Sequence, residues 1–212
     1  APVVSPDGRF LGVSTFNADS NAGSVCSGVW DTKTGKEVFR LPDKLTPSVV
    51  MPHRVSEFLN TSIAVTTQQN IVSRWNPATG AEILPRLEDP KGWIFHTSAA
   101  PDGKSLLLGL RDATVVLWDP DTNEFTYELR GLRSTLNATE YSRNGTTLVT
   151  ATQVGDVRLW DLPTGHLICD IPGAAGPISD IWFSKDERRL LALVNKPGGG
   201  SEVYVWDAGE SE

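Results

Sequence analysis

The strongest constraint on the fold is a phrase that the chain repeats at a regular period. Residues 158–165 read RLWDLPTG, an alternating apolar run that ends in Trp-Asp and is followed by a turn. Related phrases surround the repeated tryptophans Trp30, Trp75, Trp118, Trp160 and Trp206. Successive members lie 45, 43, 42 and 46 residues apart. This self-similarity indicates a chain built from structural repeats, each of them one supersecondary unit.

A second shared feature, a turn before a short apolar run, stands upstream of these tryptophans. Residues 5–8 read SPDG, residues 100–103 read APDG and residues 142–145 read SRNG. Proline presets φ in such turns and glycine accepts positive φ, so the chain reverses between two strands. Unit two is the most degenerate, because it has SEFLNTS at 56–62 and Asn76 in place of Asp. Each unit is therefore predicted as strand, turn, strand, loop, Trp-ending strand, turn, strand.

The runs between these turns favour strands over helices. In the fourth unit they are TLNATEY, TLVTAT, DVRLW and HLICDI, all short and bounded by Gly, Pro, Asn and Asp. No window sustains apolar residues at helical spacing between those breakers. The run TVVLW at 114–118 is apolar at nearly every position, as expected when both faces of a small sheet are packed. Four strands in about 40–45 residues is the spacing of a propeller blade.

With these phrases and turns, the sequence resembles the WD-repeat β-propeller family over essentially its whole length. The resemblance implies an all-β fold, a β-propeller of four-stranded antiparallel blades with five repeats visible. The expected units span about residues 1–41, 42–88, 89–130, 131–172 and 173–212, and the last lacks its outer strand. We therefore expect a segment of a larger ring of about seven blades. The open edge beside residues 202–207 is then paired with more of the same chain or with another subunit.

The chain departs from the family pattern in its polar residues. Many WD repeats carry a Gly-His pair before the first strand and an Asp six residues before the Trp. Here Asp112 stands six residues before Trp118, the other units lack this Asp, and the three histidines fall elsewhere. We therefore expect blade cohesion to rest on apolar packing.

Composition and charge restrict the classes of partner. The formal net charge is −7, which disfavours duplex nucleic acid because that binding depends on Lys and Arg contacts to phosphates. No apolar run approaches the roughly 20 residues that span a bilayer, so no direct membrane insertion is expected. Cys26 and Cys169 have no metal spacing, and two free thiols are favoured over a disulfide. The sequence leaves the compartment open; few cysteines and no recognisable signal peptide favour the cytoplasm.

The sequence contains only incomplete matches to catalytic and ligand-binding motifs. The stretch PGGGSE at 197–202 lacks the Gly-Lys-Ser/Thr ending of a phosphate loop, and DPDTNE at 119–124 lacks the Gly and distant Glu of a calcium loop. No Gly-x-Ser-x-Gly elbow and no paired His at helical spacing occur. We predict no catalytic residues, no metal and no cofactor. A small-molecule sensor or enzyme that uses the central channel is the alternative.

The resemblance implies a non-catalytic protein–protein interaction scaffold, part of a larger protein or complex. Units one and five carry 7 and 4 surplus residues, counted from the second strand to the Trp, within residues 16–28 and 195–202. These insertions are predicted to project from one face. The candidate partner-binding residues on that face are Asp19, Asn21, Trp93, Arg111, Arg133 and Lys196.

Overall fold

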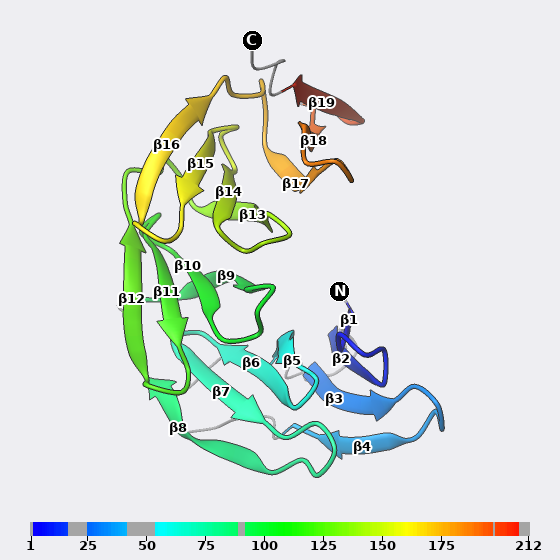
Figure 1. Cartoon of the computed structure of the whole chain (residues 1–212). Helices are drawn as coiled ribbons and strands as arrows, with labels where there is room; N and C mark the ends of the chain where they lie inside the picture. The colour runs from blue at the N-terminus through cyan, green and yellow to red at the C-terminus, as the bar shows by residue number, and fades with distance from the viewer. Residues whose placement is uncertain (1, 17–24, 42–53, 89–91, 197, 208–212) are drawn as a thin grey trace.

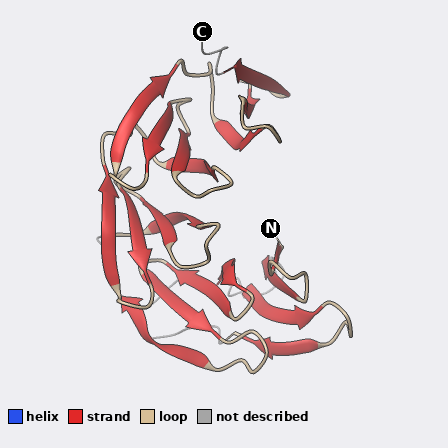
Figure 2. Ribbon diagram, in the orientation of Figure 1, coloured by secondary structure: helices blue, strands red, loops and turns tan. Residues whose placement is uncertain are grey.

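The computed structural model of the chain is built from strands (Figures 1 and 2). It describes residues 2–16, 25–41, 54–88, 92–196 and 198–207, and these ranges contain nineteen strands and no helix. The strands form five antiparallel sheets in chain order, which we call blades one to five. The all-β blade architecture predicted from the repeats is confirmed.

Strands at equivalent positions come at regular intervals along the chain. The first strands are β1 (Val3–Val4), β5 (Arg54–Asn60), β9 (Ile94–Ala99), β13 (Leu136–Tyr141) and β17 (Ile178–Phe183). The second strands are β2 (Phe10–Phe16), β6 (Ile63–Gln68), β10 (Leu106–Leu110), β14 (Thr147–Thr152) and β18 (Arg189–Asn195). The third strands are β3 (Val25–Asp31), β7 (Ile71–Trp75), β11 (Val115–Asp119), β15 (Val157–Asp161) and β19 (Ser201–Asp207). The fourth strands are β4 (Glu37–Arg40), β8 (Glu82–Glu88), β12 (Glu124–Leu129) and β16 (His166–Ile171).

The repeated tryptophans mark the same place in every blade. Each lies at or next to the last residue of the third strand and pairs with a residue of the second strand. The pairs are Trp30 with Leu11, Trp75 with Ala64, Trp118 with Leu106, Trp160 with Leu148 and Trp206 with Leu190. The register therefore aligns the five blades residue by residue, and the predicted position of the Trp is confirmed.

The turn between the first and second strands is closed by a serine and an acidic or amide side chain. Ser5 Oγ donates to Asp7 Oδ1 at 2.6 Å and accepts from the Phe10 amide at 2.9 Å. Ser142 donates in the same way to Asn144, and Ser184 to Asp186. The hydrogen bond from Ser5 holds the pKa of Asp7 below its usual value, and the amide of Arg9 adds to this effect. The turn predicted from SPDG is thus a local structure that its own residues stabilise.

The blades follow one another along an arc, with the first strands on its inner side and the fourth strands on its outer side (Figure 1). Strand β5 packs against β1, β2 and β9, and β13 packs against β9 and β17. Blades one and five lie at the two ends of the arc. In the described residues blade five has three strands, β17, β18 and β19. The larger ring of about seven blades stays a prediction.

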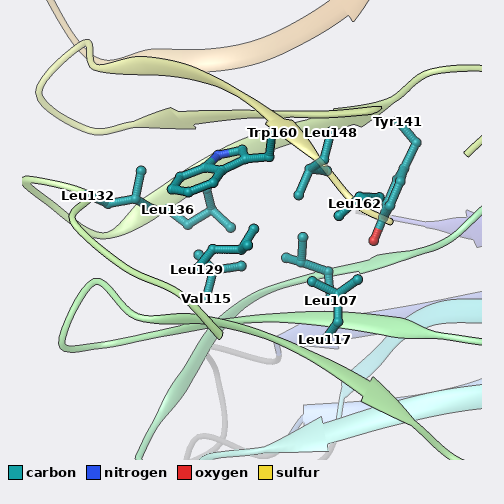
Figure 3. Close-up of a cluster of buried hydrophobic side chains, with 10 residues drawn as sticks. All are labelled: Leu107, Val115, Leu117, Leu129, Leu132, Leu136, Tyr141, Leu148, Trp160 and Leu162. Atoms are coloured by element: carbon teal, nitrogen blue, oxygen red, sulfur yellow. The ribbon is translucent and has the colours of Figure 1, made fainter. Parts of the chain in front are cut away.

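The apolar core lies between neighbouring blades. Figure 3 shows the cluster between blades three and four, in which Trp160 faces Leu132, Leu136 and Leu129. Its buried members are Leu107, Val115, Leu117, Leu129, Leu132, Leu136, Tyr141, Leu148, Trp160 and Leu162. In blades two, three and four most residues of the second and third strands are buried, since both faces of these strands pack against neighbouring blades. This explains why these strands are almost continuously apolar.

Hydrogen bonds also join the blades, and their partners are about one repeat apart in the sequence. Ser14 Oγ accepts from the Val55 amide at 3.0 Å, and Asn60 Nδ2 donates to the carbonyl of Gly103 at 3.1 Å. Asn137 Nδ2 donates to the carbonyl of Ile178 at 2.5 Å. The blades are therefore joined by these hydrogen bonds as well as by the apolar packing that was expected.

The insertions of units one and five lengthen strands as well as a loop. Strands β2, β3, β18 and β19 have seven residues each, against five in β10 and β11. Cys26 pairs with Thr15 in the extended part of the β2–β3 hairpin, and Ser201 pairs with Asn195 in that of β18–β19. The surplus residues were expected to form loops only, which is wrong for the part that pairs.

Two features of the structure favour glycine at position 165, which ends the repeated phrase of unit four. Gly165 has φ of +70°, and a Cβ at this position would lie 2.6 Å from Cδ1 of Tyr127. The Tyr127 hydroxyl donates to the carbonyl of Pro163 at 2.7 Å, which fixes the ring of blade three over the turn of blade four. Gly8 has a similar φ of +72°, but a Cβ there would meet nothing within 4 Å.

These two glycines make a matched pair of substitutions. Gly8→Ala is expected to destabilise the protein by about 1 kcal/mol, the cost of a side chain at positive φ. Gly165→Ala should cost roughly 1 kcal/mol more, because Tyr127 must move away from its place between the blades. Urea unfolding of both variants measures the difference. Equal losses would show that Tyr127 does not constrain the turn.

Candidate functional site

In blades three, four and five, the residues that enter the first strand lie beside the turn between the second and third strands, and together they form one face of these blades. We call it the entry face. The carbonyl of Trp93 accepts from the amide of Arg111 at 2.9 Å, that of Thr135 from Gln153 at 3.3 Å, and that of Pro177 from Asn195 at 2.9 Å. The three carbonyls occupy equivalent places in blades three, four and five.

Trp93 and Arg111 form a pair on the entry face of blade three. The guanidinium carbon of Arg111 lies 5.4 Å from the centre of the Trp93 ring, within the range of a cation–π contact. Trp93 is 43% exposed. In the part of the chain that the structure describes, Arg111 has no carboxylate partner. The pair therefore presents an aromatic surface and a cation that can accept a carboxylate from outside.

Phe95 adds a second exposed aromatic two residues further along the chain. It is the bulge residue of β9, because Gly109 pairs with His96 and Leu110 with Ile94. The bulges of β13 and β17 place Asn137 and Ser179 at the equivalent position. Those two side chains hydrogen-bond to backbone carbonyls, whereas Phe95 is 56% exposed. The sequence analysis did not predict Phe95 as a site residue. The signal that could have indicated it is the aromatic side chain at a position where blades four and five have Asn137 and Ser179.

Two of the remaining predicted residues form ion pairs within the chain. Arg133 is held 3.6 Å from Asp156, and Lys196 forms an ion pair with Glu202, so both cations already have partners. Asp19 and Asn21 lie outside the described residues. The structure thus brings Trp93 and Arg111 together out of the six candidates. Val154, an exposed side chain in the β14–β15 turn, is a further residue that sequence reasoning missed.

The inner strands carry buried titratable side chains. Burial raises the pKa of Glu57 on β5 to about 7, although the amides of Phe58 and Ala99 hydrogen-bond to its carboxylate. Burial lowers the pKa of His96 on β9 to about 4. His96 Nε2 lies 3.0 Å from Thr139 Oγ1 of the next blade. Both side chains lie between the inner strands of neighbouring blades, where the charged form is poorly solvated.

The titratable side chains of the inner strands are not repeated at the same position in every blade. The register places Glu57 and Glu140 at equivalent positions of β5 and β13, where β9 and β17 have Ser98 and Trp182. Burial and the nearby Asp180 and Glu187 raise the pKa of Glu140. Among the described residues, no three His, Cys, Asp or Glu side chains are grouped so that they could hold a metal. Nor is any helix in that part of the chain suited, by length and apolar character, to crossing a membrane.

Comparison with known proteins finds relatives built from the same repeats. The chain is 28% identical over 145 residues to the WD repeat-containing protein 91 homolog of Dictyostelium discoideum, covering 63% of this chain and 18% of that protein. It is 29% identical over 125 residues to the human WD repeat domain-containing protein 83, covering 56% of this chain and 38% of that protein. The repeats of this chain are similar to those of WD-repeat proteins.

A further relative is the small ribosomal subunit protein RACK1y of Oryza sativa, which is 26% identical over 128 residues; 60% of this chain and 34% of that protein are covered. No protein-family model matches the chain. The chain spans less than two fifths of the length of each of the three relatives. Such relatives support a protein-interaction scaffold in general, without a specific role.

Proposed function

We propose that this chain is a non-catalytic scaffold, a segment of a larger protein or assembly, that binds a protein partner through the entry face of blade three. The observation that carries the proposal is the exposed aromatic pair Trp93 and Phe95, with Arg111 stacked on Trp93. Exposed aromatics beside an arginine are the side chains most enriched among interface anchors. An isolated domain gains nothing from exposing them.

The chemistry of these three residues indicates the kind of partner. An extended peptide segment with an apolar side chain would bury the faces of Trp93 and Phe95. A carboxylate next to that side chain would pair with Arg111, which lacks an acidic partner in the described residues. The overall charge of −7 makes nucleic acid a poor partner. The proposed partner is therefore a protein segment that is both apolar and acidic.

Substitution on the entry face tests this proposal. Affinity capture with the wild-type protein identifies partners, and binding of each purified partner is then titrated against the Trp93→Ser/Phe95→Ser variant. We expect at least a ten-fold loss of affinity, because truncating one interface anchor removes about 2 kcal/mol or more. Arg111→Gln should weaken binding less and reduce its dependence on salt.

The outer strands supply the matched control. Phe125 of β12 and Leu167 of β16 are exposed to a similar degree as Trp93 but lie on the rim of the arc. The Phe125→Ser/Leu167→Ser variant should bind as the wild type does. If the rim variant loses binding and the entry-face variant keeps it, the partner docks on the outer strands and the proposal is wrong.

The alternative function is a small-molecule sensor or enzyme that uses the central channel. The partly buried Glu57, His96 and Glu140 favour it, because titratable groups with shifted pKa values gather at functional sites. Against it, Glu57 already accepts two backbone hydrogen bonds and His96 already contacts Thr139. These contacts give both side chains a role in joining the blades, so the scaffold is the function that we favour.

A further inference from the structure

The turn between the first and second strands of blade four contains the one Asn-Gly pair of the sequence, Asn144 and Gly145. Asparagine is among the chemically least stable residues of proteins. It loses ammonia through a cyclic imide, and glycine as the next residue has no side chain to hinder closure of that ring. Asn144 is exposed, and a Cβ at Gly145 would meet only Cδ of Pro101, at 3.9 Å. The pair is therefore open to water.

Three other blades have a carboxylate where blade four has this amide. Asp7, Asp102 and Asp186 occupy the equivalent positions of blades one, three and five. Each accepts with Oδ1 from the amide two residues further along the chain, at 3.1, 2.9 and 3.3 Å. Asn144 Oδ1 accepts from the amide of Thr146 in the same way, at 3.1 Å. The turn is thus built around an oxygen acceptor, which asparagine and aspartate share.

The serine of the turn is also suited to a carboxylate. Ser142 Oγ donates to Asn144 Oδ1 at 2.7 Å, as Ser5 Oγ donates to Asp7 Oδ1 at 2.6 Å. In blades one and five this hydrogen bond from serine holds the pKa of the aspartate below its ordinary value. A carboxylate at position 144 would receive the same hydrogen bonds and stay ionised.

We infer that Asn144 is a site of spontaneous deamidation, which converts the turn of blade four to the aspartate form found in blades one, three and five. The backbone nitrogen of Gly145 attacks Cγ of Asn144, a new C–N bond closes the cyclic imide, and the side-chain nitrogen leaves as ammonia. Water then adds to a carbonyl of the imide and opens the ring. In sum, an amide and water become a carboxylate and ammonium. The inference is independent of the proposed role of the entry face.

The closed turn slows this reaction but does not prevent it. The amide of Gly145 donates to the carbonyl of Ser142 at 2.8 Å, and this bond must open before the nitrogen can reach Cγ of Asn144. Exposed turns open locally, with a much smaller free energy than global unfolding requires. We therefore expect deamidation in the native protein, at a lower rate than in the chain unfolded by urea.

Opening of the imide at its other carbonyl gives isoaspartate, in which the backbone passes through the side chain and is one atom longer. The neighbouring Arg143 ties this turn to blade five. Its amide donates to Glu187 Oε1 at 2.5 Å, and its guanidinium donates to the carbonyl of Lys185 at 2.9 Å. A longer turn displaces Arg143 from these partners, so the isoaspartate form should unfold at a lower temperature than the aspartate form.

Mass spectrometry of the aged native protein tests this inference. Cleavage after arginine gives the peptide 144–158, which contains Asn144, and the peptide 134–143, which contains Asn137 before alanine. After incubation at mildly alkaline pH, fragment ions of 144–158 should show at Asn144 the mass gained when an amide NH2 is exchanged for OH. Peptide 134–143 should keep its mass. If 144–158 keeps its mass in the native protein while the sample in urea gains it, the fold protects the turn and the inference is wrong.

Two variants separate the chemistry from its consequence for the fold. Asn144→Asp supplies the product directly and should unfold at the wild-type temperature or above it. Asn144→Gln keeps the amide but needs a larger ring, so its peptide should not gain mass. A gain in Asn144→Gln at the wild-type rate would place the reaction at another residue and overturn the inference. A clearly lower unfolding temperature for Asn144→Asp would show that the turn does not accept the carboxylate, which would also overturn it.

Discussion

Replacement of Trp118 by alanine is expected to lower the free energy of unfolding by about 3–5 kcal/mol, as for other large buried aromatics. Trp118 is completely buried among apolar residues of blades two and three, including Val65 and Val72. Its indole Nε1 donates to Asn123 Oδ1 at 3.2 Å. The buried Arg74 lies over its ring, 5.7 Å from the centre. Alanine would leave a cavity in this joint and an arginine without its aromatic contact.

Denaturant unfolding measures this loss, and Trp93→Ala is its control. Trp93 has the same chemistry but is nearly half exposed, so its truncation should cost less than about 1 kcal/mol. Trp206→Ala should fall between the two, because Trp206 of blade five is only partly buried against blade four. Equal losses for Trp118→Ala and Trp93→Ala would mean that the repeated tryptophans do not join the blades.

Glu57→Gln should stabilise the protein by on the order of 3 kcal/mol above pH 7 and have little effect below pH 4.5. The folded pKa of about 7 lies above the ordinary value of 4.5. Between these values the folded state binds more protons than the unfolded state, so wild-type stability falls as the pH rises. Above pH 7 the folded protein holds a buried carboxylate. Glutamine keeps the shape of the side chain without that charge.

The titration of His96 gives the folding stability the opposite dependence on pH. Its folded pKa of about 4 lies below the ordinary 6.5, so the unfolded state binds more protons in that window. Stability that His96 contributes is lost as the pH falls from 6.5 towards 4. In the wild type the two dependences largely cancel between pH 4.5 and 6.5. In Glu57→Gln the contribution of His96 is no longer offset by Glu57, so stability should rise with pH more than it does in the wild type.

Thermal unfolding of the wild type and Glu57→Gln from pH 4.5 to 8.5 checks both signs. Glu124→Gln, on an exposed position of β12, is the control and should follow the wild-type profile. Parallel profiles of Glu57→Gln and wild type across the whole range would show that Glu57 is well solvated in the folded protein.

The blade architecture could be predicted because its signals are local in the sequence. A strand ends at Trp-Asp, a turn follows with glycine at positive φ, and the next strand begins, as around Trp160 and Gly165. The period of the phrase then sets the number of strands per blade. The same signals placed the strands of unit four within one or two residues of β13, β14, β15 and β16.

The candidate site was predicted less completely, because exposure depends on contacts between repeats. Trp93 and Arg111 were placed on one face by alignment alone, and the structure brings them into contact. Phe95 was missed because its exposure follows from a bulge that shifts the pairing of β9. Arg133 and Lys196 were predicted as partner-binding residues, and the folded blades place Asp156 beside Arg133 and Glu202 beside Lys196.

Amide hydrogen exchange of the native protein is the most direct test of the blade architecture. The second and third strands of blades three and four, β10, β11, β14 and β15, have paired neighbours on both sides and packed blades on both faces. Their amides should exchange slowest, at the rate set by global unfolding, whereas those of the outer strands β12 and β16 should exchange faster. Exchange from β10 and β11 as fast as from β12 would contradict the blade architecture.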